Sequence, residues 1–323
     1  MTPGDEATLT RFNDRLADTV EILQTTSEDP RSEIFRQFGE TLARLVPRVK
    51  ISSEKGENND LPMFQVSTAI HYQAVPSGPE LSPFLNCLEW LDKGAPPLAE
   101  ADLRQLDGLV APAFAQIFIA PNCPHCPVTV SRLLPLAASA KRFHLKVIDG
   151  DLFPELAKAA DIRSAPTVIL DDRFRWTGRV DIGELVEMAV KRDPTRLGAA
   201  ALRGLIEEGN AARLADMMQQ AGAVFPAFIE LLQDDKWPVR LGAMVAFEYL
   251  VDAAPSLAAQ VVQPLWERFP ELEDTIKGDV LHVLAQTGCK ALIPQLTVIS
   301  DSGASEELRA AAAEALAHLS GYE

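Results

Sequence analysis

Cysteine is scarce in this chain: four occur among 323 residues, and two of them, Cys87 and Cys289, stand alone. So few cysteines cannot make the disulfide network of a small secreted domain, and a reducing cytoplasm is the expected compartment. The chain also lacks the run of about 18 apolar residues that a membrane-spanning helix needs. Its start, MTPGDEATLT, has neither the basic region nor the apolar core of a secretory signal peptide.

Positive charge is in deficit, with 30 lysines and arginines against 46 aspartates and glutamates, for a net charge of −16. This charge argues against nucleic acid and against an anionic membrane as partners. The deficit is uneven. Residues 1–111 have 18 acidic and 10 basic side chains, residues 112–196 have 10 and 12, and residues 197–323 have 18 and 8. The middle segment is therefore mildly basic between two acidic ones.

The middle segment contains the other two cysteines, three positions apart in APNCPHCPVTV, with Pro124 and His125 between Cys123 and Cys126. The apolar run FAQIFIA before them predicts a buried strand, and apolar residues at helical spacing after them predict a helix. The expected elements are a strand at 114–120, a helix at 127–143, a strand at 145–151, a helix at 153–162, strands at 166–170 and 175–180, and a helix at 182–192. This β-α-β-α-β-β-α order is typical of the thioredoxin fold.

The spacing of the two cysteines suits dithiol chemistry. Cys123 is expected at the N-terminus of a helix, where free amides and the helix dipole favour a thiolate. Cys126 is expected on the same helical turn, shielded from solvent and close enough to form a disulfide with Cys123. A positive charge on His125 would favour the thiolate further, and a stabilised thiolate makes the disulfide more oxidising.

Two other interpretations of the cysteine pair agree less well with its surroundings. A zinc site needs four ligands, and no second cysteine or histidine pair accompanies this one, so no metal is expected. The cysteines could also be core residues, but their place between a strand and a helix is the one that a redox motif requires. Pro166, at the start of a strand in SAPTVIL, supports the redox interpretation. In the thioredoxin fold a proline there is cis, and the backbone before it faces the disulfide and pairs with the substrate chain.

Four stretches resemble the N-terminal domain of the bacterial alkyl hydroperoxide reductase flavoprotein, which joins two thioredoxin folds. They are CPHCP at 123–127, IDGDLFPE at 148–155, SAPTVIL at 164–170 and FRWTGRV at 174–180. That domain passes electrons from a flavin domain to the disulfide of a peroxiredoxin. The resemblance implies Cys123 as the attacking thiol, Cys126 as the resolving thiol and Pro166 as the cis-proline. Pro124 and His125, between the two cysteines, are also predicted as residues of the site.

The sequence departs from that family in two ways. No Gly-x-Gly-x-x-Gly stretch occurs, so flavin and nicotinamide domains are not expected and no cofactor is predicted. The strand before the cysteines offers only Gln116 and Ile117 where thioredoxin-like proteins often bury a carboxylate. Proton transfer to or from Cys126 therefore needs water or another group.

Residues 1–95 repeat the strand and helix pattern without the cysteine pair. TTSEDP stands where the cysteines would be, Pro62 corresponds to Pro166, and Cys87 is expected in the core of the closing helix. This half is either a spacer or a docking surface beside the redox site. Residues 96–111 are expected to link it to the redox-active fold at 112–193.

Residues 199–323 resemble HEAT-type helical repeats. The expected second helices are 235–250, 272–288 and 305–319, the first helices are 223–233, 257–269 and 291–299, and residues 199–222 form an opening pair. Repeats of this kind leave a broad surface, on which Trp237 or Trp266 could anchor a partner. Cys289 is expected in a turn, without a role. We therefore expect a module for binding or assembly.

The fold class that follows is α/β plus all-α: two tandem thioredoxin-like folds, the second with Cys-Pro-His-Cys, and then a HEAT-like solenoid. The predicted function is a cytoplasmic, glutaredoxin-like thiol–disulfide oxidoreductase. Its expected partners are a protein disulfide, such as that of a peroxiredoxin-like protein, and a separate reductase. The alternative is a non-enzymatic protein whose dithiol senses redox state. The direction of electron flow stays open.

Overall fold

The structure of the chain is a computed structural model that describes residues 1–56, 60–94 and 98–321. Its contacts divide the chain into two compact units, Met1–Lys191 and Arg192–Glu323. The first unit combines strands and helices, whereas the described part of the second is helical. This confirms the predicted combination of an α/β part followed by a largely helical part.

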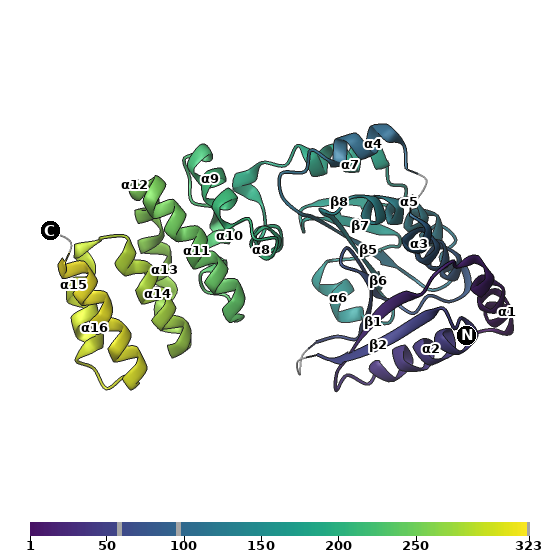
Figure 1. The fold of residues 1–323 in the computed structure, drawn as a ribbon, viewed down its shortest axis with the longest axis horizontal. Coiled ribbons are helices and arrows are strands. Elements are labelled where there is room, and N and C mark those ends of the chain that lie inside the picture. Colours follow the sequence, from purple (N-terminus) through teal and green to yellow (C-terminus); the bar gives the residue numbers. More distant parts are fainter. Residues whose placement is uncertain (57–59, 95–97, 322–323) are drawn as a thin grey trace. The chain divides into compact units, whose positions relative to one another are not determined.

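An eight-stranded mixed sheet is the frame of the first unit (Figure 1). The strands are β1 (Val20–Thr26), β2 (Val49–Lys55), β3 (Met63–Ser67), β4 (Ile70–Gln73), β5 (Ala113–Ile119), β6 (Phe143–Asp149), β7 (Thr167–Leu170) and β8 (Phe174–Thr177). Their order across the sheet is β2-β1-β3-β4-β6-β5-β7-β8. In each half a parallel pair is followed by two antiparallel neighbours, and the halves join where β4 pairs in parallel with β6.

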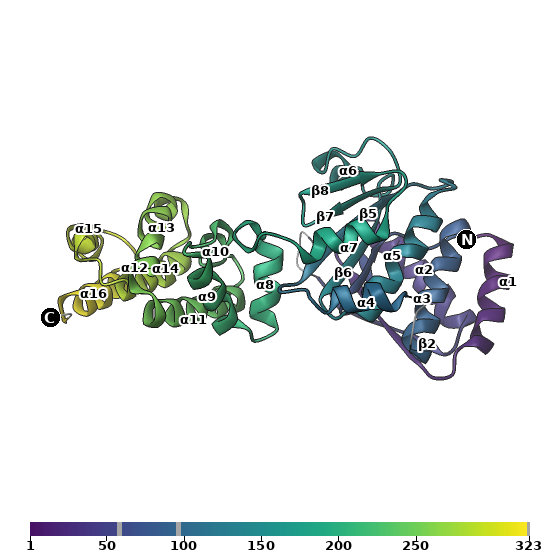
Figure 2. The same ribbon diagram turned by 90° about the horizontal axis from the view of Figure 1, so that it is seen from above.

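The helices of the first unit, most of which cover one face of this sheet, contribute to one continuous core. They are α1 (Pro3–Phe12), α2 (Ser32–Leu45), α3 (Leu81–Lys93), α4 (Glu100–Leu106), α5 (Cys126–Ser139), α6 (Pro154–Ala159) and α7 (Ile182–Val190). Helix α3 packs beside α5 on that face, with α2 next to β1 and β2, and α6 lies on the opposite face (Figures 1 and 2). In α2 the buried Phe35, Phe38 and Leu42 recur every three to four residues, as a helix with one apolar face requires.

The stretch 96–111, expected as a linker, contains helix α4 in its described part. Helix α4 packs against α7, and Leu106 and Leu109 enter the core of the unit. The Gly- and Pro-rich letters before it conceal the short helical spacing of EADLRQL. The expected boundary at 95 and 96 itself lies outside the described residues.

The second unit is a succession of helices (Figure 2). They are α8 (Ala199–Glu207), α9 (Ala211–Ala221), α10 (Pro226–Leu231), α11 (Trp237–Ala253), α12 (Pro255–Ala258), α13 (Val262–Arg268), α14 (Asp274–Gln286), α15 (Ile293–Ser300) and α16 (Glu306–Gly321). Helix α11 contacts both α9 and α14, and α16 contacts α14 and α15. The helix expected at 257–269 is divided, because Pro264 has no amide hydrogen and fits only the first turn of α13.

One buried residue recurs in the three long helices of this unit. Val239, Ile276 and Leu308 take corresponding places near the starts of α11, α14 and α16, and their side chains are buried. After Val239 comes Arg240, whose guanidinium is also buried. Its Nε donates to Asp279 Oδ2 on α14 at 2.7 Å, and its Nη1 donates to the Asp234 carbonyl at 2.6 Å. Arg240 therefore joins two successive long helices through a charge-assisted hydrogen bond.

Replacing Gly242 with alanine is expected to destabilise the second unit. A Cβ at this position of α11 would overlap the side chain of Ile206 on α8. Such overpacking costs about 1–3 kcal/mol of the free energy of unfolding. Gly278 of α14 is the matched control, because the nearest atom to a Cβ there is Ala311 Cβ at 3.9 Å. Gly278→Ala should instead stabilise by about 0.5–1 kcal/mol, since alanine favours helix. Thermal unfolding of both variants checks this, and equal stability of Gly242→Ala and the parent chain would contradict it.

Candidate functional site

The cysteine pair lies in the turn between β5 and α5. Helix α5 begins at Cys126, and Cys123 precedes its first turn. The two cysteines differ in exposure, since Cys126 is fully buried whereas Cys123 is half-buried, and both are free thiols. Pro124 and His125 between them are exposed, and His125 is the residue before the first turn of the helix. A partner can therefore reach Cys123 but not Cys126.

Two short contacts define the surroundings of Cys123 Sγ. The backbone N–H of Cys126 donates to it at 3.2 Å, and Cys123 Sγ in turn lies 3.6 Å from the carbonyl oxygen of Ala165. The outer sulfur therefore accepts a hydrogen bond from the backbone at the start of α5. For Cys126, burial and then the interaction with Cys123 raise the pKa of the thiol to about 12. The geometry therefore suits a reactive outer thiol and a protonated inner one.

Pro166 lies directly beside this pair. The Ala165–Pro166 peptide bond is cis, and it is the one cis bond of the described residues. The hydroxyl of Thr167 donates to the Ser164 carbonyl at 2.8 Å, and the N–H of Gly178 donates to the Pro166 carbonyl at 2.8 Å. These bonds fix the turn that presents the Ala165 carbonyl to Cys123. Pro62 stands before β3 as Pro166 stands before β7, in agreement with the correspondence expected from the sequence.

Glu80, at the start of α3, is the residue of this site that the sequence did not reveal. Its side chain is 9% exposed, and neither carboxylate oxygen has a hydrogen-bond partner among the residues that the structure describes. Burial first, and the charge of Asp149 second, raise its pKa to about 7. Glu80 also lies close enough to Cys126 for its charge to contribute to the raised pKa of that thiol. An acidic residue opening a helix is common, so the letters PELSPFLNCLEWL gave no signal of this role.

A cavity of about 230 Å³ connects these groups. Glu80, Cys123 and Asp149 line it together, along with residues of α1 and of the turn before α3. Burial raises the pKa of Asp149, although its Oδ1 accepts the N–H groups of Asp151 at 2.9 Å and Leu152 at 3.1 Å. In the sequence this segment, IDGDLFPE, was informative only through its resemblance.

A second hollow, of about 470 Å³, is lined in part by Ala165. Ile119 and Ala120 line both hollows, and the second one also contains Gly150, Pro154, Lys158 and Arg163. The segment from Asp149 to Pro154 therefore borders both hollows.

In the second unit, the three residues that the sequence singled out have different surroundings. Cys289 is half-buried in a turn. Trp237 is 55% exposed, whereas Trp266 stacks on Phe269 with ring centroids 4.9 Å apart. Within 1–56, 60–94 and 98–321, no three histidine, cysteine or carboxylate side chains converge as metal ligands.

Comparison with known proteins agrees with this geometry. A family model described as a thioredoxin domain matches residues 115–191, which include the cysteine pair and Pro166. This chain contains a thioredoxin-like domain. Solved structures share the fold of the thioredoxin-like part. The N-terminal domain of alkyl hydroperoxide reductase from Enterococcus faecalis aligns with a TM-score of 0.52 at 20% identity, over 58% of this chain and 99% of that one. A protein disulfide oxidoreductase from Aeropyrum pernix aligns with a TM-score of 0.52 at 14% identity, over 61% and 95%.

Curated relatives resemble the same part of the chain. An alkyl hydroperoxide reductase protein of Xanthomonas campestris is 24% identical over 201 residues, 59% of this chain and 38% of that protein. A Bacillus subtilis protein named NADH dehydrogenase is 22% identical over 186 residues, 56% of this chain and 36% of its own length. The chain thus spans little more than a third of these relatives. The resemblance to alkyl hydroperoxide reductase that the sequence suggested is confirmed.

No described helix has both the length and the apolar character needed to cross a bilayer.

Proposed function

We propose that this chain is a thiol–disulfide oxidoreductase that exchanges electrons between Cys123–Cys126 and a disulfide of a protein partner. The observation that carries the proposal is the asymmetry of the pair beside the cis-proline turn. Cys123 is accessible and receives the N–H of Cys126, whereas Cys126 is buried and protonated. Similarity to a protein disulfide oxidoreductase supports it.

The reaction takes two steps. Cys123 thiolate attacks one sulfur of the partner disulfide, and the other partner sulfur leaves as a thiolate that takes up a proton. Cys126 then loses its proton and attacks Cys123 Sγ, which releases the second partner thiol and leaves a Cys123–Cys126 disulfide. Two electrons pass to the partner, and a separate reductase restores the dithiol.

Glu80 supplies the base for the second step. With burial and Asp149 raising the pKa of Glu80 to about 7, its carboxylate accepts a proton near neutral pH, directly or through water in the cavity. Strand β5, where thioredoxin-like proteins often bury a carboxylate, has Gln116 and Ile117 and cannot supply a base for Cys126.

The architecture we propose is two tandem thioredoxin folds followed by HEAT-like repeats. The shared strand pattern in the two halves of the sheet supports the tandem folds, and the recurring Val239, Ile276 and Leu308 support the repeats. The repeats serve as the partner-binding adaptor. A peroxiredoxin-like protein is the proposed partner, because the chain resembles the alkyl hydroperoxide reductase relatives. The proposed compartment is the cytoplasm.

A turnover assay tests the proposed activity. The purified chain, with dithiothreitol as electron donor, should reduce the disulfides of insulin faster than dithiothreitol alone. Carboxamidomethylation of Cys123, which is the accessible thiol of the pair, should remove this difference. Turnover that equals the rate of dithiothreitol alone would refute the proposal.

Loss of the helical unit should reduce the rate on the protein partner but not on small disulfides. A shortened chain ending at Lys191 keeps the whole first unit. We expect its rate on a small disulfide to stay within about twofold, and its rate on the partner to fall about tenfold or more, because the effective concentration of the partner near Cys123 drops. Since residues 197–323 have 18 acidic and 8 basic side chains, added salt should narrow that difference. Stopped-flow rates on both substrates check this, and unchanged partner rates would contradict the adaptor role.

A further inference from the structure

The turn between β1 and α2 has the same place in the first half of the sheet as the cysteine turn has in the second. Its letters are Asp29-Pro30-Arg31-Ser32, and α2 begins at Ser32 as α5 begins at Cys126. Asp-Pro-Arg-Ser thus stands where the other half has Cys-Pro-His-Cys. This turn has no thiol, but several hydrogen bonds connect its side chains.

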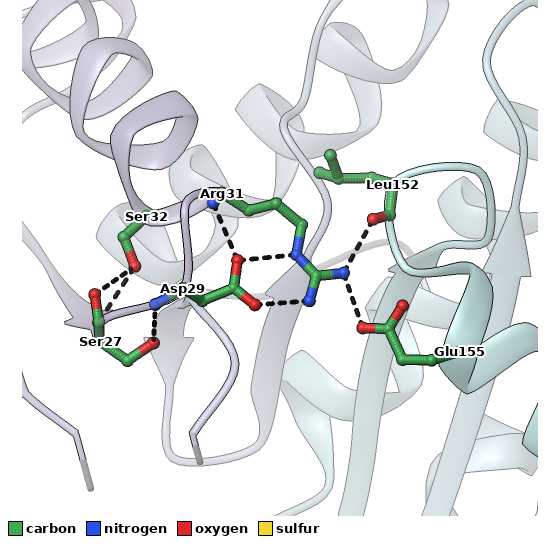
Figure 3. Close-up of polar contacts among 6 residues, drawn as sticks. All are labelled: Ser27, Asp29, Arg31, Ser32, Leu152 and Glu155. Atoms are coloured by element: carbon green, nitrogen blue, oxygen red, sulfur yellow. Dashed lines mark hydrogen bonds and ion pairs between the residues drawn. The ribbon is translucent and has the colours of Figure 1, made fainter. Parts of the chain in front are cut away.

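Arg31 is held rigidly within its own turn (Figure 3). Its Nε donates to Asp29 Oδ1 at 2.8 Å and its Nη2 donates to Asp29 Oδ2 at 2.6 Å, a bidentate pair. The backbone N–H of Arg31 also donates to Asp29 Oδ1 at 2.8 Å. Ser32 Oγ in turn accepts the N–H of Ser27 at 3.0 Å and donates to the Ser27 carbonyl at 3.1 Å. The guanidinium therefore has one fixed direction.

That direction is toward the second half of the unit. Arg31 Nη1 donates to the carbonyl of Leu152 at 3.0 Å and pairs with Glu155 Oε1 at 2.6 Å (Figure 3). Its guanidinium carbon also lies 4.4 Å from the centre of the Phe153 ring, a cation–π contact. One side chain of the first half thus contacts Leu152 and Phe153 in the loop after β6 and Glu155 in the first turn of α6.

The same loop is bonded to the cysteine site at its other end. The N–H of Leu152 donates to Asp149 Oδ1, and the N–H of Gly150 donates to the carbonyl of Ile119, the last residue of β5. Both backbone groups of Leu152 are therefore hydrogen-bonded: its N–H donates to Asp149, and its carbonyl accepts from Arg31. Asp149 lines the cavity shared with Glu80 and Cys123, and Gly150 and Pro154 line the hollow beside Ala165.

We propose that Arg31, oriented by Asp29, is a positioning residue for the redox site. It holds the segment of residues 149–155, from the end of β6 to the first turn of α6, so that the Asp149 carboxyl stays beside Glu80. The effect of Arg31 on the reaction rests on the proposed thiol–disulfide exchange. Its effect on the position of Asp149 does not depend on that proposal. The half without cysteines then contributes twice to the site, through Glu80 directly and through Arg31 by way of the loop.

The consequence is a change in the titration of Glu80 when Arg31 is lost. Burial, and after it the like charge of Asp149, keep the pKa of Glu80 high, so release of Asp149 should lower that pKa in part. The titratable groups around Glu80 come from several elements. They are Met1 and Asp5 by α1, Tyr72 on β4, Cys123 and Cys126 by α5, and Asp149 on β6. Among these groups, Asp149 is the one bonded to the loop that Arg31 binds.

The test compares Arg31→Met with Arg36→Met in the full chain. Arg36 lies on α2, which follows Arg31 directly, and pairs with Glu33 and Glu40 of the same helix, so it controls for the loss of a nearby ion pair. In Arg31→Met, amide hydrogen exchange at Leu152 should speed up about tenfold or more as its fixed carbonyl is released. The titration midpoint of the ¹³C-labelled Glu80 carboxyl, assigned with Glu80→Gln, should fall by about 0.5–1 pH unit. Arg36→Met should change neither.

These two measurements require no turnover, so they stand or fall apart from the proposed activity. If the chain reduces disulfides, the pH dependence of the rate should move down with the midpoint of Glu80 in Arg31→Met. Arg31→Lys, which keeps one charge but cannot make the bidentate pair, should lie between the parent chain and Arg31→Met, and it carries the test if Arg31→Met does not fold. Parent-like exchange at Leu152 and a parent-like Glu80 midpoint would overturn the inference, as would equal changes in Arg36→Met.

Discussion

Cys123→Ser is expected to lower the rate of disulfide reduction by about a thousandfold or more, because the hydroxyl cannot replace the thiolate as nucleophile at neutral pH. The same substitution at Cys289, a half-buried cysteine in the second unit, is the matched control and should leave the rate unchanged. Insulin reduction with dithiothreitol gives the rates. If Cys123→Ser and the parent chain reduced insulin at comparable rates, Cys123 would not be the attacking thiol.

The companion variant Cys126→Ser should stop the reaction after its first step. Cys123 is then free to attack a partner, but no inner thiol can release it, so a mixed disulfide accumulates. Non-reducing electrophoresis followed by mass spectrometry should find discrete partners bound through Cys123. A protein that only senses redox state would give no covalent partners. It would instead change partner affinity on oxidation, which separates it from the exchange mechanism.

Local patterns in the sequence were sufficient to predict most of the first unit. The apolar run FAQIFIA predicts β5, and the structure places that strand at Ala113–Ile119. The place of Cys126 at the start of α5 also followed from the strand before it and the helical spacing after it. These features depend on neighbours in sequence, and such features are the most predictable ones.

The groups around the thiols could not be predicted in the same way. Glu80 opens a helix in the first half, and it reaches Cys126 only because α3 packs beside α5 in the folded unit. Its significance depends on burial without a hydrogen-bond partner among the described residues, which no spacing of letters reveals. Likewise TTSEDP could be recognised as lacking cysteines, whereas the bonds of Arg31 to Leu152 and Glu155 depend on tertiary structure.

Glu80→Gln is expected to slow the release of the mixed disulfide by about a hundredfold above pH 7, because the amide cannot accept the proton of Cys126. Burial and Asp149 raise the pKa of Glu80 to about 7, so below that pH the parent chain also lacks the carboxylate. The two rates should therefore converge as pH falls. Quenched-flow measurement of Cys123–Cys126 disulfide formation, from pH 5 to 9, gives the comparison.

Glu80→Gln should be more stable than the parent chain, although it reacts more slowly. Because the pKa of Glu80 is raised from 4.5 to about 7 on folding, the neutral carboxyl stabilises the fold below pH 4.5, and that contribution is lost as pH rises through 7. Glutamine stays neutral, so Glu80→Gln should be more stable than the parent chain above pH 7, by about 3 kcal/mol for a pKa raised from 4.5 to about 7. Glu89→Gln on the same helix is the control, since its carboxyl pairs with Arg15 and Lys93 at the surface and should leave the exchange profile unchanged. If Glu80→Gln reacts more slowly but is more stable, the Glu80 carboxylate acts in the reaction. If the variant is both slower and less stable, Glu80 has a structural role instead.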